Sequence, residues 1–150
     1  MVITSLSRQG YRDLAYDIAS KHYQAVLEVY RRTGTFYEYY APEATEPGFM
    51  ARDRFVGWGG LAPIALLIEY LIGIKADYPE ETIRWDIHQL EAHGIERYPF
   101  GPDGMVDLKC ARRSSANERP RVTVHSSVPL TLIITYGKGK SETLRIEPDR

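Results

Sequence analysis

The sequence predicts an α+β protein, with a helical first half followed by a small antiparallel β sheet or sandwich. Three observations lead to this prediction. Apolar residues recur at intervals of three and four between residues 11 and 32, the stretch 55–74 is almost uncharged, and apolar and polar residues alternate from residue 82 onward. The only candidate border between the halves is the segment 76–80, where the period changes.

The first predicted helices come from residues 1–7 and from residues 11 to about 32. Residues 1–7 are typical of the last turns of an apolar helix, with Gly10 behind them as a stop signal. Gly34 should end the second helix. The residues expected on the buried face of that helix are Tyr11, Leu14, Ala15, Ile18, His22, Ala25, Val26 and Val29.

The stretch 55–74 contains one charge, Glu69, and comes near the length of a membrane span. Three glycines interrupt its beginning, and Pro63 fits the first turn of a helix, so we expect the helix to start near Leu61. From there to Ile72 it would extend only about 18 Å, which is too short for a bilayer. A helix that is apolar nearly all round is expected in the centre of a larger protein.

The second half is predicted to consist of short strands. In the first of them, residues 82–88, the apolar Ile83, Trp85 and Ile87 share one face. Turn signals such as Gly-Pro-Asp-Gly at 101–104 separate the later candidates. These are residues 95–98, 105–110, 121–125, 130–136 and 143–146.

Composition narrows the possible partners. The 150 residues include 19 basic and 20 acidic side chains with no long block of one sign, so we expect neither nucleic acid nor a membrane as a partner. Residues 1–10 lack a secretory pattern, and we expect a cytoplasmic location. The single cysteine, Cys110, lies on a strand pattern and is expected to be structural, and the four histidines lack metal-ligand spacing. We therefore predict no metal and no cofactor.

The candidate site is the run 34–43, followed by the run 52–60. The first run sets one carboxylate, Glu38, among Phe36, Tyr37, Tyr39 and Tyr40, in a segment with neither a helical nor a strand period. A pyranose ring offers C–H faces to aromatic rings and hydroxyls to polar groups, and cleavage of its acetal requires carboxyl groups. The pattern therefore favours sugar chemistry.

Ordinary structural roles explain the same residues. Glu38 fits a solvated loop position, and the aromatic rings fit the space between helices as well as they fit a ligand. Trp58, between glycines, fits either a wedge between helices or one wall of a sugar pocket. His22 is expected in the core.

Two segments carry a family resemblance: Gly-Thr-Phe-Tyr-Glu-Tyr-Tyr-Ala-Pro at 34–42 and Asp-Arg-Phe-Val-Gly-Trp-Gly-Gly-Leu-Ala-Pro at 53–63. They resemble the last part of the six-hairpin (α/α)6-barrel glycoside hydrolases, above all the mannosylglycerate hydrolase-like enzymes, which are related to trehalases and processing α-glucosidases. The resemblance implies that residues 1–76 are the C-terminal helical hairpins of the barrel and that residues 80–150 are a β extension.

The resemblance also implies a chemistry and a set of residues. Glu38 would be the general base of an inverting glycoside hydrolase, and Trp58, Tyr37, Tyr39 and Tyr40 would contact an α-glycoside or small saccharide substrate. The general acid of such enzymes is an Asp on an earlier hairpin, and no residue here matches its motif. The chain would then be a C-terminal fragment that is inactive alone and that needs the N-terminal part of the barrel as its partner.

Two other hypotheses remain open. In the first, the chain is a non-catalytic carbohydrate-binding or interaction module, in which the aromatic segment stacks a sugar and Glu38 only accepts a hydrogen bond. In the second, the chain is a remnant that folds poorly, because the apolar helix at 61–74 lacks neighbours.

Overall fold

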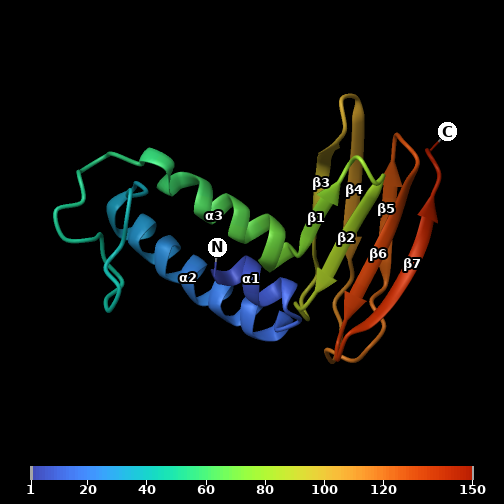
Figure 1. Cartoon of the computed structure of the whole chain (residues 1–150), viewed down its shortest axis with the longest axis horizontal. Helices are drawn as coiled ribbons and strands as arrows, with labels where there is room; N and C mark the ends of the chain where they lie inside the picture. The colour runs from blue at the N-terminus through green and yellow to red at the C-terminus, as the bar shows by residue number, and fades with distance from the viewer. Residues whose placement is uncertain (1, 150) are drawn as a thin grey trace. The chain divides into compact units, whose positions relative to one another are not determined.

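The computed structural model describes residues 2–149, which form two compact units, 2–71 and 72–149. The first unit is helical and the second consists of strands (Figure 1). The division falls between Leu71 and Ile72, ahead of the segment 76–80 that the change of period indicates, because Ile74–Asp77 already forms the first strand.

The helical unit begins with α1 (Val2–Arg8) and α2 (Arg12–Thr33). The end of α2 confirms the expected stop signal: Gly34 takes a left-handed conformation with φ 74°, and its N–H donates to the carbonyl of Tyr30 at 2.7 Å. Only glycine adopts this conformation without a steric cost, so the residue type fixes the end of the helix.

The chain returns along α2 through η1 (Gly57–Gly60), α3 (Leu61–Leu66) and the π-helical turn η2 (Leu67–Ile72) (Figure 1). The core between these helices contains Ala15, Ala19, Leu66, Tyr70 and Leu71. The expectation of a helix buried all round is wrong, because Leu61 is 69% exposed and Ile64 is also largely exposed. Only one side of α3 packs against α2.

The strand unit contains two sheets. Its strands are β1 (Ile74–Asp77), β2 (Thr82–Ile87), β3 (His93–Phe100), β4 (Gly104–Cys110), β5 (Val122–Ser126), β6 (Leu130–Tyr136) and β7 (Lys140–Ile146). The first sheet has the order β1-β2-β6-β7 and the second has the order β3-β4-β5. Every strand candidate overlaps an observed strand, and β1 is additional.

The first sheet is not purely antiparallel, which corrects the prediction for this half. Strands β2 and β6 pair in parallel, with Thr82 opposite Thr131 and Ile87 opposite Tyr136. Parallel neighbours require a long crossover connection. Here the crossover contains the whole second sheet, because β3, β4 and β5 lie between β2 and β6 in the chain.

Trp85 of β2 anchors the core of the strand unit. Its side chain is fully buried, and the indole N–H donates to the carbonyl of Ile72 at 2.9 Å. The ring meets His93 of the second sheet edge to face, with centroids 6.0 Å apart. The alternation predicted for β4 is confirmed, since Val106, Leu108 and Cys110 are all buried. Burial also raises the pKa of the Cys110 thiol, in keeping with a structural role.

The prediction that this chain is the end of an (α/α)6 barrel is wrong. The described residues form three α-helices, two further helical turns and seven strands in two sheets, and they contain no helical barrel. The fold is mostly β. The resemblance to six-hairpin, trehalase-like and mannosylglycerate hydrolase-like enzymes therefore fails, and with it the view of the chain as a fragment that completes such a barrel.

Among residues 2–149, no helix is both long enough and apolar enough to cross a membrane.

Candidate functional site

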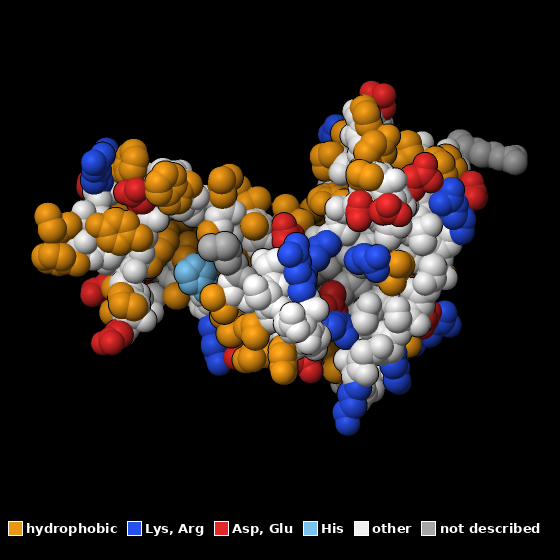
Figure 2. Space-filling model, in the orientation of Figure 1, with side chains coloured by type: hydrophobic (Ala, Val, Ile, Leu, Met, Phe, Trp, Pro, Cys, Tyr) orange, Lys and Arg blue, Asp and Glu red, His pale blue; other side chains and the backbone are white. Residues whose placement is uncertain are grey.

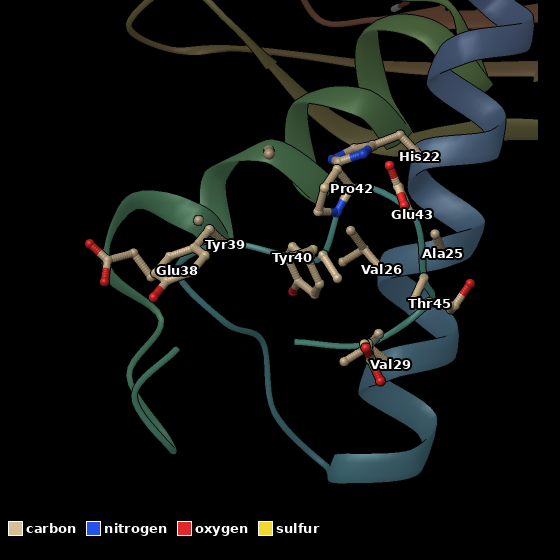
Figure 3. A pocket seen from close by; sticks show the side chains of 15 residues that line it. His22, Ala25, Val26, Val29, Glu38, Tyr39, Tyr40, Pro42, Glu43 and Thr45 are labelled. Atoms are coloured by element: carbon tan, nitrogen blue, oxygen red, sulfur yellow. The ribbon is translucent and has the colours of Figure 1, made fainter. Parts of the chain in front are cut away.

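The helical unit contains a cavity of about 580 Å³ beside α2 (Figure 3). One wall is the middle of α2, and the opposite wall is the loop that follows this helix. The lining residues are His22, Ala25, Val26, Val29, Glu38, Tyr39, Tyr40, Ala41, Pro42, Glu43, Ala44, Thr45, Glu46, Gly59 and Ala62. Aliphatic, aromatic and acidic side chains thus surround one space.

Backbone hydrogen bonds shape the loop that forms the second wall. Tyr40 and Pro47 form an isolated β-bridge, and the N–H of Ala41 donates to the carbonyl of Glu46 at 3.1 Å. The N–H of Gly48 donates to the carbonyl of Tyr39 at 3.1 Å. The run Ala41–Glu46 is therefore a closed hairpin-like loop.

Gly59 positions the segment that carries Glu38. A Cβ atom on Gly59 would collide with the carbonyl oxygen of Tyr37 and would lie 2.9 Å from that of Glu38. The absence of a side chain lets η1 approach this backbone closely. The two sequence runs of the candidate site are thus brought together, although they are about 20 residues apart in the chain.

The carboxylate of Glu38 lies at the edge of the cavity. The side chain is half-buried and lies against Gly57, where a Cβ atom would be 3.5 Å from Cγ of Glu38. Within residues 2–149 the carboxylate has no hydrogen bond and no ion pair. In Figure 3 it extends away from Tyr40 and Val26, at the opposite end from His22 and Glu43.

The three predicted tyrosines have different roles. Tyr39 and Tyr40 line the cavity, whereas Tyr37 is only 7% exposed and does not line it. The N–H of Tyr37 donates to the hydroxyl of Tyr40 at 3.1 Å, and the two rings meet edge to face. Tyr39 is 43% exposed, and its hydroxyl donates to the carbonyl of Phe49 at 2.8 Å. Tyr37 thus braces the ring of Tyr40.

Trp58 lies outside the cavity. Its side chain is 76% exposed and is not among the lining residues. Figure 2 shows exposed hydrophobic side chains on the helical unit. Trp58 is one of the exposed large hydrophobic residues of the chain. The structure therefore brings Glu38, Tyr39 and Tyr40 to one cavity and leaves Tyr37 and Trp58 out.

Three ionisable lining residues were not among the sequence candidates: His22, Glu43 and Glu46. The spacing on α2 assigned His22 to the core, but its side chain is exposed to the cavity. A polar histidine within the apolar stripe of this helix was the sequence signal for a cavity position. Glu43 ends the aromatic run 34–43, and its position after Pro42, close to the aromatic rings in the sequence, was the signal for this residue.

The cavity residues do not suggest a metal site. No group of three His, Cys, Asp or Glu side chains in the described part of the chain has metal-binding geometry. The acidic and histidine side chains of the lining are Glu38, Glu43, Glu46 and His22. Such a site can accept hydrogen bonds and can pack against apolar ligand surfaces.

A comparison with known proteins finds a distant relative of uncharacterized function. The chain is 26% identical over 106 residues to an uncharacterized protein of Borreliella burgdorferi (strain ATCC 35210 / DSM 4680 / CIP 102532 / B31), a match that covers 63% of this chain. The chain spans only 22% of that relative's length. No protein-family model matches the chain, and no solved structure matches it. None of these comparisons points to a glycoside hydrolase.

Proposed function

We propose that the helical unit binds a saccharide in the cavity beside Tyr39 and Tyr40. The supporting observation is that two aromatic rings, several aliphatic side chains and three carboxylates surround one cavity of about 580 Å³. A pyranose packs its C–H faces on aromatic rings and donates its hydroxyl protons to carboxylates. The volume also falls within the range of roughly 300–1,000 Å³ that is usual for small-molecule sites.

Each wall has a part in this proposal. Tyr39, which is partly exposed, offers a ring face for stacking, and Tyr40 closes the apolar side together with Val26. Glu43 and Glu46 accept hydrogen bonds from sugar hydroxyls, and Glu38 does the same at the edge. Neither nucleic acid nor a membrane is expected as a partner, because basic and acidic residues are balanced. A cytoplasmic location remains a prediction.

The test is calorimetric titration of the whole chain with methyl α-glucopyranoside and with maltose. Replacement of Tyr39 by Ala removes the stacking surface and should weaken binding about tenfold, since an aromatic contact contributes roughly 0.5–1.5 kcal/mol. Tyr39→Phe keeps the ring and loses only the hydroxyl bond to Phe49, so it should bind almost normally.

The control is Tyr11→Ala, which removes an exposed tyrosine outside the cavity. This variant should bind like the unmodified chain. Equal loss of affinity in Tyr11→Ala and Tyr39→Ala, or no saccharide binding by the unmodified chain, would contradict the proposal.

A second candidate is that Glu38 acts as the general base of glycoside hydrolysis. One observation favours it: the carboxylate has no hydrogen bond or ion pair within residues 2–149, so both oxygens are available to a water molecule. Inversion also needs a second carboxyl group, about 6.5–9.5 Å away, that acts as the acid. No residue of the sequence matches the acid motif of such enzymes.

This candidate has its own test. The purified chain should not hydrolyse 4-nitrophenyl α-glucoside. In a longer hydrolytic protein that contains the chain, Glu38→Gln should lower the rate by about 10²–10⁴, the usual contribution of a general base. Turnover by the purified chain, or a near-normal rate in the Glu38→Gln variant, would contradict the assignment.

A further inference from the structure

The charge around the saccharide cavity is one-sided. Glu38, Glu43 and Glu46 line it together with His22, and no lysine or arginine is among its lining residues in the part of the chain that the structure describes. The three carboxylates come from the same loop, and the bond from Ala41 to Glu46 closes that loop beside α2. In the view of Figure 3, Glu43 and His22 both lie on the side opposite Glu38.

Two basic residues of α2, Lys21 and Arg32, are engaged with acids or carbonyls. Lys21 Nζ lies 2.7 Å from Asp17 Oδ2, and Arg32 Nε lies 3.9 Å from Glu28 Oε1. A terminal nitrogen of Arg32 also donates to the carbonyl of Thr45, which is one of the lining residues. These acidic partners offset the positive charges, so the local field in the cavity comes mainly from its own carboxylates.

We propose that the cavity selects neutral and amine-bearing sugars over anionic sugars such as uronates and sugar phosphates, with Glu43 and Glu46 as the residues that determine this selectivity. The inference rests on the proposed saccharide function and names the ligand class of the same site. Both side chains are exposed, so water weakens their field without removing it.

Simple electrostatics gives the size of the effect. An anionic group about 8 Å from each of three carboxylates, in a medium close to water, is disfavoured by about tenfold in affinity at low salt. At 1 M salt the Debye length is about 3 Å, so most of this discrimination should disappear. A difference caused by shape alone would survive the salt.

The experiment is a calorimetric titration of the whole chain with three matched probes: methyl α-glucopyranoside, glucosamine and glucuronic acid. At about 20 mM salt and neutral pH, glucuronic acid should bind about tenfold more weakly than the neutral glycoside, and glucosamine should bind at least as tightly. At 1 M NaCl the three affinities should converge.

Variants assign the selectivity to the loop. The double variant Glu43→Gln/Glu46→Gln removes two charges and keeps side-chain size, so glucuronic acid should gain about fivefold in affinity relative to the neutral glycoside. The control double variant Asp53→Asn/Glu69→Gln removes the same charge from exposed positions outside the lining. It should leave the ratio unchanged.

The outcomes separate this inference from the function on which it rests. If all three probes bind equally at low salt, or if glucuronic acid binds most tightly, the charge selectivity is wrong while saccharide binding stands. An equal change of the ratio in both double variants also overturns the assignment to Glu43 and Glu46. If no probe binds at either salt concentration, the saccharide function itself fails.

Discussion

At the scale of single residues, Gly59 determines where Glu38 lies. Because a Cβ atom at position 59 would collide with the backbone of Tyr37, Gly59→Ala should force η1 away from the loop. Forcing an extra methyl group into such a contact costs about 1–3 kcal/mol. Urea unfolding followed by circular dichroism at 222 nm measures the loss, and saccharide affinity should fall with it. The exposed change Ala65→Ser on α3 is the control, and an equal effect of both changes would contradict this role.

His93 makes the strand unit sensitive to acid. Burial is the main cause that lowers the pKa of its imidazole, and the positive charge of Arg113 lowers the pKa further. A hydrogen bond with the carbonyl of Glu91 at 2.8 Å raises the pKa in part. The unfolded chain therefore binds more protons than the folded chain as the pH falls through the ordinary histidine value of about 6.5. Stability should decrease from pH 7.5 to pH 5 and level off below the folded pKa.

The variant His93→Asn tests this sign, because an asparagine amide can donate to Glu91 and does not titrate. Its free energy of unfolding should change less between pH 7.5 and pH 5 than that of the unmodified chain. The exposed His22→Asn change serves as a control and should preserve the full pH dependence of the strand unit. A His93→Asn variant with unchanged pH dependence would refute this explanation.

The sequence predicted the site only in part, and the reason lies in its loop. A helical period identifies the buried face of α2 in part: Ala15, Val26 and Val29 are buried, whereas Tyr11 and Leu14, expected on the same face, are exposed. No such period applies to residues 36–47, so the sequence could not tell which rings face the cavity. Tyr39 and Tyr40 do so, whereas Tyr37 packs inward as a brace.

At the scale of elements, alternation and turn residues located the strands correctly. They did not predict which strands pair with each other. The strand β4 follows the predicted alternation, whereas β1 has only four residues, too few to show a pattern. Alternation also says nothing about the direction of the neighbouring strand. The parallel pairing of β2 with β6 depends on the long crossover and could not be read from either strand.

Arg113 joins elements in a way that no sequence pattern indicated. Its buried guanidinium donates from Nη2 to the carbonyls of Ile87 and Gln89 at 3.1 and 3.0 Å. From Nη1 it donates to the carbonyls of Ala116 and Glu118 at 3.1 and 3.0 Å. The end of β2 and the loop 114–118 are thus held by one planar group with fixed donor directions.

Replacement of Arg113 by Lys should therefore destabilise the strand unit by about 3 kcal/mol, because a lysine ammonium cannot serve four carbonyls in one plane. The matched control is Arg112→Lys at the neighbouring position, where the exposed guanidinium lies 3.3 Å from Glu91. Urea denaturation followed by Trp85 fluorescence in a Trp58→Phe background measures both. Similar small losses in the two variants would contradict a special role for Arg113.

At the scale of the whole molecule, two short motifs misled the assignment of the fold. The run 34–42 is a loop, and the run 53–63 contains a loop, the turn η1 and the first residues of α3. The two runs come together through the contact of Gly59. Such local segments do not specify how many helices surround them. The two compact units show that fewer helices and more strands are present than a barrel requires.

The division of the chain leads to a prediction about its pieces. A piece that spans residues 72–150 retains β1 and the carbonyl of Ile72 that accepts the indole N–H of Trp85, so it should fold. A piece that spans residues 80–150 lacks both and should unfold at lower urea concentration. Fluorescence of Trp85 compares them directly. Equal stability of the two pieces would contradict the border between Leu71 and Ile72.

The central claim is that the helical unit holds a saccharide between α2 and the loop 38–46, and backbone amide NMR of the whole chain tests it most directly. Addition of methyl α-glucopyranoside should shift the amide signals of residues 38–46 and those around His22, and the shifts should saturate with a single dissociation constant. The strand unit should remain unperturbed. Shifts confined to residues 72–149, or none at millimolar sugar, would contradict the claim.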